Sequence, residues 1–162
     1  MNITLIHSTH GRRGLLMQFC DRLRKFCVKY GSDANPDALA EAAAQAYFSD
    51  TPGMLCFAIV EDGKIVAHAI VTLEGYYGKV SVNIPQFWKD PGTKIDNEIY
   101  REFFRFVSGW ARYNGADVIR MTARSGAVAT VLAKHGFTET GRVLMSRPLD
   151  KEEVWERVGE TR

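Results

Sequence analysis

The stretch that decides the fold covers residues 121–149 and reads MTARSGAVATVLAKHGFTETGRVLMSRPL. Apolar side chains recur at helical spacing between Gly126 and His135, which predicts a short helix after the end of a strand. Gly136 is placed to stop this helix in a left-handed cap, and Phe137 follows as a large apolar anchor. The residues after this Gly-Phe corner alternate loosely, as in a strand. The stretch is therefore predicted to be a strand–helix–strand unit.

Upstream of this unit, turn and cap signals separate further elements. Asn35 and Pro36 suit the N-cap and first position of a helix, and Asp62-Gly63 between two apolar runs is typical of a hairpin. The expected elements are a strand at 2–6, helices at 15–30 and 37–48, hairpin strands at 54–60 and 65–73, a strand at 79–87, a long helix at 95–114 and a strand at 118–122.

This order predicts the fold class. A strand, a long helical crossover and another strand imply at least one parallel pair. We therefore expect an α/β (α+β) fold with a mixed, mostly antiparallel central sheet flanked by helices. Residues 1–149 are expected to form one domain, and residues 150–162 a short charged helix or tail, in which Asp150 and Glu153 have capping-box spacing.

Composition excludes several classes of partner. The chain has 162 residues, 46% of them hydrophobic, and a formal net charge of +2, so no strong attraction to nucleic acid or a membrane surface follows. No apolar run is long enough for a membrane span. The three cysteines, Cys20, Cys27 and Cys56, are expected to be buried thiols in a reducing compartment, which favours a cytoplasmic protein.

The strand–helix–strand unit resembles the corresponding unit of the GNAT superfamily of N-acetyltransferases, which use acetyl-coenzyme A. The resemblance rests on Lys134 and the Gly136-Phe137 corner, and the order of elements is similar throughout. The Asp90-Pro91-Gly92 loop before the long helix, and the W-A-R-x-x-G end of that helix, look most like divergent acetyltransferase-like proteins encoded by bacteriophages. For such a protein the location would be the host cytoplasm or the virion, with other phage proteins as partners.

The resemblance implies where acetyl-CoA would bind. In the family, the third strand of the sheet splays from its neighbour, and the pantetheine arm pairs with main-chain groups in the gap. Here that region is Val82, Asn83 and Ile84, followed by Pro85, which is consistent with a disrupted ladder. The pyrophosphate would meet the loop before the long helix, and Ser125 stands where the family often has an Asn. The implied phosphate contacts are Lys89, Gly92, Thr93 and Lys94.

Two features depart from the family pattern. Leu132 stands where the family often has a Tyr that protonates the leaving thiolate, and a leucine has no proton to donate. Asp96 and Glu98 stand near the glycine positions of the pyrophosphate loop. Carboxylates in the first turn of a helix suit the helix dipole by themselves, so an ordinary capped helix is an equally good interpretation of this segment.

Candidate catalytic residues are Glu74, Asn83 and His68. Glu74, just past the hairpin, could deprotonate an amine directly or through water, although such a loop glutamate is more often only solvated. Asn83 shares one side of its strand with Ser81, near the expected point of acyl transfer. His68 is either a base or a packed histidine. His7 and His10 lack further ligands, so no metal site is expected.

Three functions remain open on the sequence. The first is a GNAT-like enzyme that moves an acetyl group from acetyl-CoA to an unknown primary amine. The second is a non-catalytic protein on the same fold, such as a structural or interaction component of a phage virion. The third is a regulatory sensor of acyl-coenzyme A. Fold alone does not decide among them.

Overall fold

The computed structural model describes residues 1–10, 13–30, 35–76, 78–122 and 126–138. The chain divides into two compact units, Met1–Thr122 and Ala123–Arg162, which are described separately. The first unit contains β1 (Asn2–Leu5), η1 (Ser8–His10), α1 (Arg13–Tyr30), α2 (Pro36–Phe48), β2 (Met54–Glu61), β3 (Lys64–Tyr76), β4 (Lys79–Lys89), α3 (Asn97–Tyr113) and β5 (Ala116–Met121), and the second contains α4 (Gly126–Lys134).

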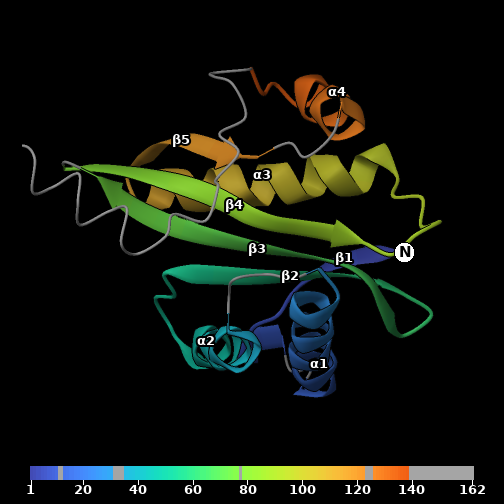
Figure 1. Ribbon diagram of the computed structural model, residues 1–162. Helices are drawn as coiled ribbons and strands as arrows, with labels where there is room; N and C mark the ends of the chain where they lie inside the picture. The colour runs from blue at the N-terminus through green and yellow to red at the C-terminus, as the bar shows by residue number, and fades with distance from the viewer. Residues whose placement is uncertain (11–12, 31–34, 77, 123–125, 139–162) are drawn as a thin grey trace, which may run out of the picture. The chain divides into compact units, whose positions relative to one another are not determined.

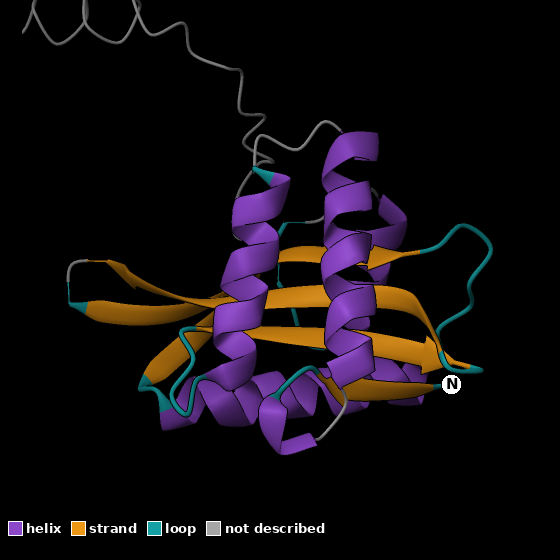
Figure 2. Ribbon diagram, turned by 90° about the horizontal axis from the view of Figure 1, so that it is seen from below, coloured by secondary structure: helices purple, strands orange, loops and turns teal. Residues whose placement is uncertain are grey.

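The sheet confirms the expected class. Its strands lie in the order β1-β2-β3-β4-β5, and every neighbouring pair is antiparallel except β4 and β5, which are parallel. The helix α3 provides the crossover between the two parallel strands. Figures 1 and 2 show α1 and α2 on one face of this sheet and α3 on the other.

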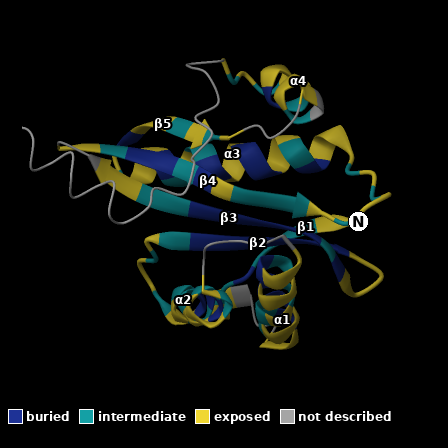
Figure 3. Ribbon diagram, in the orientation of Figure 1, coloured by how far each residue is buried: buried dark blue, intermediate teal, exposed yellow. Residues whose placement is uncertain are grey.

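Apolar packing on both faces of the sheet holds the first unit together. Phe19 and Leu23 of α1 and Tyr47 of α2 pack with Cys56 and Ile70 in the cluster beneath the two helices. A second cluster joins Ile59, Ala67 and Ile99. Because helices cover both faces, β2 is buried at every position from 55 to 60, and buried residues are concentrated in the central strands (Figure 3).

Local signals in the sequence explain where the elements begin and turn. The Asn35 side chain accepts hydrogen bonds from the main-chain N–H groups of Asp37 and Ala38, at 3.0 and 3.2 Å, so the expected N-cap is confirmed. At the β2–β3 turn, Asp62 and Gly63 have φ of 48° and 75°. Two consecutive residues with positive φ are the mark of a type I′ hairpin turn.

Several strand ends differ from expectation. β3 continues to Tyr76, so Glu74 lies on a strand and not in a loop. β4 continues to Lys89 and β5 begins at Ala116. The extension follows from the pairing of β3 with β4, which continues to Gly75↔Val80 and Tyr76↔Lys79 and gives hydrogen-bond partners to main-chain groups there. The expected strand after the Gly-Phe corner, the tail at 150–162 and the domain limit between 149 and 150 lie outside the described residues.

The cysteines are all free thiols in the structure. Cys27 and Cys56 are buried, and Cys20 is half-buried with its thiol donating to the Ala40 carbonyl at 3.6 Å. Burial raises the pKa of Cys56 to about 12 and also raises the pKa of Cys20. Both thiols are therefore protonated and unreactive at neutral pH. Among the described helices, none has the length and apolar character needed to cross a membrane.

Candidate active site

β4 has two neighbouring strands over its first half only. It runs parallel to β5 from Val80↔Ala116 to Ile84↔Met121. Beyond that pair it stays registered with β3, from Gln86↔Ile70 to Lys89↔Ala67. Within the described part of the chain, no strand lies beside the other edge of β4 over residues 86–89. We call this edge the open edge of β4.

A β-bulge separates the two halves of β4. Thr72 pairs with Asn83, and Ile70 pairs with Gln86, so three residue steps on β4 face two on β3. The extra residue falls at Ile84 or Pro85, and proline lacks the N–H that a regular ladder needs. The expected break in the ladder is therefore present, but Val82, Asn83 and Ile84 still pair with β5. The open edge begins after these three residues, which corrects the expected position of the gap.

The structure brings two of the predicted catalytic residues together. Asn83 Nδ2 donates a hydrogen bond of 2.8 Å to Glu74 Oε1. Ser81, which pairs with Glu74 in the ladder, donates its hydroxyl to the Glu74 carbonyl at 3.5 Å. Among the residues described, nothing else bonds to the Glu74 carboxylate, and Glu74 is exposed. This carboxylate is oriented by an amide and accessible to an incoming amine.

His68 is separated from that pair and belongs to a different network. It is 1% exposed, lies between the rings of Phe19 and Phe26 at centroid distances of 5.9 and 5.5 Å, and accepts a 2.9 Å hydrogen bond at Nδ1 from Arg22 Nε. Burial, and then the adjacent Arg22, lower the pKa of His68 to about 3, against smaller opposing effects of Gln86 and Asp90. A buried neutral ring of this kind fits the packed-histidine interpretation better than a base.

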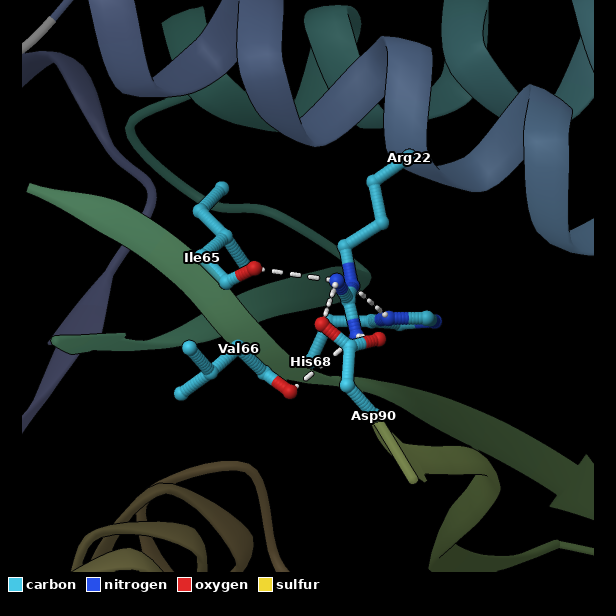
Figure 4. A network of polar contacts seen from close by, with 5 residues as sticks. All are labelled: Arg22, Ile65, Val66, His68 and Asp90. Carbon is cyan, nitrogen blue, oxygen red and sulfur yellow. Dashed lines mark hydrogen bonds and ion pairs between the residues drawn. The ribbon is translucent and has the colours of Figure 1, made fainter. Parts of the chain in front are cut away.

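Arg22 and Asp90 complete the His68 network (Figure 4). The two terminal nitrogens of Arg22 donate to both Asp90 oxygens, at 2.9 and 3.1 Å, and to the carbonyls of Ile65 and Val66, at 2.9 and 3.2 Å. With the bond to His68, all five N–H groups of the guanidinium are used. The sequence alone does not single out this pair, because the two residues lie 68 positions apart and no local motif contains both.

The predicted phosphate contacts lie in one loop between β4 and α3. Lys89 Nζ donates to the Thr93 carbonyl at 2.6 Å, and the Thr93 N–H donates to the Asp90 carbonyl at 3.1 Å. Gly92 and Lys94 are exposed on the same loop. The loop thus places two ammonium groups, Lys89 and Lys94, within a few residues of the first turn of α3.

The start of α3 carries the two acidic residues noted in the sequence. Asp96 is the N-cap residue, but its side chain makes no cap hydrogen bond. Glu98 pairs with Arg101 at 2.8 Å. The charge of Glu98 is therefore offset by a neighbour on the same helix, and Asp96 is the carboxylate that a phosphate at this helix end would meet.

The second unit confirms the predicted helix stop. Gly136 has φ of 84°, its N–H donates to the Ala133 carbonyl at 3.2 Å, and the Phe137 N–H donates to Leu132 at 3.1 Å. This pair of bonds is a Schellman motif, which requires the left-handed glycine. Leu132 is buried. Ser125 lies outside the described residues.

Other predicted residues take ordinary roles. His7 bonds through its two ring nitrogens to the Thr9 hydroxyl, at 2.9 Å, and the Ser49 carbonyl, at 2.8 Å. The described part of the chain contains no group of three His, Cys, Asp or Glu side chains placed to hold a metal ion.

Comparison with known proteins supports the fold through structure alone. No family model matches the chain, and no curated protein matches it. A solved probable acetyltransferase has 12% identity and a TM-score of 0.65, over 93% of this chain and 99% of the other. AAC(6')-Iy, solved with the bisubstrate analog CoA-S-monomethyl-acetylneamine, has 18% identity and a TM-score of 0.62, over 92% and 98%.

A third solved protein, described as a predicted acetyltransferase from Clostridium acetobutylicum with acetyl-CoA, has 17% identity and a TM-score of 0.62, over 94% of this chain and 97% of the other. Near-complete coverage of both chains at such low identity establishes a shared architecture and leaves the chemistry to the site itself. The chain shares its fold with these solved acetyltransferases.

Proposed function

We propose that this protein transfers an acetyl group from acetyl-CoA to a primary amine. The observation that carries the proposal is the bulge in β4, after which the strand has an open edge. Main-chain N–H and C=O groups along such an edge can pair with the amide groups of a pantetheine arm, as another strand would. The solved proteins of the same fold that contain acetyl-CoA or a CoA analog support this choice of coenzyme.

The loop between β4 and α3 would hold the coenzyme phosphates. Lys89 and Lys94 supply positive charge there, and the N-terminal end of α3 supplies main-chain N–H groups. Asp96 opposes phosphate binding at that end. We therefore expect coenzyme to bind, but more weakly than it would to a loop without this carboxylate.

Glu74 and Asn83 would act on the amine. The coenzyme supplies the acetyl group as a thioester. As the amine nitrogen forms its bond to the carbonyl carbon and the carbon–sulfur bond breaks, the amine must lose a proton. Glu74 accepts that proton, directly or through one water, while Asn83 holds the carboxylate in position. Leu132 has no proton to give, so the thiolate would take its proton from water.

Two other functions fit the same fold. Leu132 and Asp96 favour a non-catalytic protein, such as a virion component, or a sensor that binds acyl-coenzyme A without turnover. None of the comparisons supports the phage part of this alternative. The cytoplasmic location remains part of the proposal, because coenzyme A chemistry and reduced thiols both belong in a reducing compartment.

A thermal shift assay tests the proposal. Acetyl-CoA at a hundredfold excess over its Kd should stabilise the protein by about 2.7 kcal/mol, which raises Tm by about 5–10 °C. Release of the coenzyme thiol should follow when amino acids, polyamines, aminoglycosides or peptides are offered as acceptors. A shift without release on any amine would indicate a sensor, and no shift at millimolar acetyl-CoA would refute coenzyme binding.

The variant Glu74→Gln separates catalysis from binding. It keeps an oxygen that can accept the Asn83 bond but removes the base, so turnover should fall by about 10²-fold or more with an unchanged thermal shift. Glu61→Gln is the matched control, because Glu61 is also an exposed strand glutamate but lies at the β2–β3 turn. Equal activity of both variants would remove Glu74 from the mechanism.

A further inference from the structure

A hollow lies under α1, between that helix and the strands β3 and β4. Its volume is about 370 Å³, within the range of small-ligand sites. One stripe of α1, the start of β3 and the end of β4 with its loop form the walls. The residues that matter to the argument are Arg22, Lys25, Phe26, Lys64, Trp88 and Asp90.

The lining of this hollow is positively charged. Four basic residues, Arg22, Lys25, Lys29 and Lys64, face two acidic ones, Asp21 and Asp90. Arg22 and Asp90 neutralise each other through two hydrogen bonds, and Asp21 lies 3.5 Å from Arg24. Within the described residues, no carboxylate pairs with Lys25 or Lys64, so their ammonium groups are available to an anion.

The floor of the hollow is aromatic and held in place. Phe26 and Trp88 meet edge to face at 5.4 Å, and both are half-buried. The Arg22 side chain is 15% exposed and ties α1 to β3 and to the end of β4. Two half-buried rings beside two lysine ammonium groups favour a ligand that combines a flat ring with an anionic group.

From this arrangement we propose that the hollow is a binding site for a small ligand in which a carboxylate or phosphate is attached to a flat ring. The ring packs on Trp88 and Phe26, and the anion pairs with Lys25 and Lys64. A polycation is disfavoured by the same charges. The site lies on the face of the sheet that α1 covers, whereas α3 packs on the opposite face (Figure 2), and the proposal does not depend on acetyl transfer.

Titration calorimetry with phenyl phosphate tests this site without any coenzyme. We expect one saturable site with a Kd on the order of 0.1–1 mM that weakens as salt is added. Phenol, which keeps the ring but lacks the dianion, should give no saturable heat. The double variant Lys25→Gln/Lys64→Gln should weaken phenyl phosphate by about tenfold or more, and Trp88→Leu should weaken it as well.

Two controls make the result specific. Lys79→Gln removes the same charge at the far end of β4 and should leave the Kd unchanged. Lys94→Gln removes charge from the loop before α3. If Lys94→Gln weakens phenyl phosphate and the double variant does not, the probe occupies the loop and the proposal is wrong. Absence of saturable heat, or equal loss in Lys79→Gln, would also overturn it. Each variant is first shown to be folded, by a Tm close to that of the parent protein.

Discussion

At the scale of single residues, Arg22 shows how much one buried side chain can organise. It comes from the middle of α1, yet its partners lie on β3 and on the residue that follows β4. Arginine suits this position because its planar group presents five donors at fixed angles. The Ile65 and Val66 carbonyls and one imidazole nitrogen accept hydrogen bonds from it, and the Val66 carbonyl also accepts one from the Asp90 N–H at 2.9 Å.

The variant Arg22→Lys tests that dependence. Lysine keeps the charge but offers three donors from one nitrogen, so several of the five bonds must be lost. Denaturant unfolding should show a loss of about 2–4 kcal/mol. Arg24→Lys is the control two residues away, because its ion pair with Asp37 at 2.8 Å is exposed and should contribute much less to stability. Similar losses in both would contradict the role assigned to Arg22.

His68 provides a second test at this scale, through pH. Its pKa is near 6.5 in the unfolded chain and is lowered to about 3 in the fold. As pH falls below 6.5, the unfolded chain takes up a proton that the folded chain does not, so stability is lost with falling pH.

We expect His68 to contribute a loss of about 1.4 kcal/mol for each pH unit between about 6 and 3. His68→Gln, which keeps an acceptor for Arg22 Nε, should lack this part of the pH dependence. The measurement is the free energy of unfolding in urea from pH 7 to pH 4. An identical slope in parent and variant would mean that His68 is protonated in the folded protein.

At the scale of elements, replacing a glycine should have opposite effects on the free energy of unfolding in the β2–β3 turn and in the helix α3. Gly63 has a positive φ, which a side chain disfavours by roughly 1–2 kcal/mol. Gly109 lies inside α3, with no atom within 4 Å of the place where a Cβ would be. Gly63→Ala should therefore lower the free energy of unfolding by about 1 kcal/mol, while Gly109→Ala should raise it by about 0.5–1 kcal/mol. Changes of the same sign, measured by denaturant unfolding, would contradict the two backbone assignments.

The first turn of α3 decides how well a polyanion can bind. Asparagine caps a helix as well as aspartate does, so Asp96→Asn removes a charge and little else. We expect it to lower the Kd of acetyl-CoA by about 3- to 10-fold, measured by calorimetry in low salt. Glu102→Gln removes an exposed charge from a later turn of the same helix and should have a smaller effect. Equal effects would point to net charge and away from a phosphate contact at this helix end.

At the scale of the whole molecule, the sequence patterns predicted the features that are built from consecutive residues. The Asn35 cap, the Asp62-Gly63 turn and the Gly136 helix stop each rest on a few consecutive residues, and each is confirmed. The contact of Asn83 with Glu74 depends on the register of two long strands, and the Arg22–Asp90 pair joins residues 68 positions apart. No local pattern encodes such pairings. The sequence therefore indicated candidate residues, but it could not predict which of them are in contact.

The division of the chain into two units leads to a final prediction. The two apolar clusters described above consist of residues before 122, and β5, the parallel neighbour of β4, ends at Met121. A fragment of residues 1–122 should therefore unfold in one cooperative thermal transition.

A shorter fragment, residues 1–115, is the control. It lacks β5, so the first half of β4 loses its parallel neighbour. The edge of β4 over residues 80–84 is then exposed to solvent in addition to the open edge over residues 86–89. Such an edge promotes association between chains, so this fragment should unfold at lower temperature and form larger species in sedimentation. If residues 1–122 show no cooperative transition while the full chain does, the first unit owes its stability to the residues that follow it, and its core is not self-sufficient.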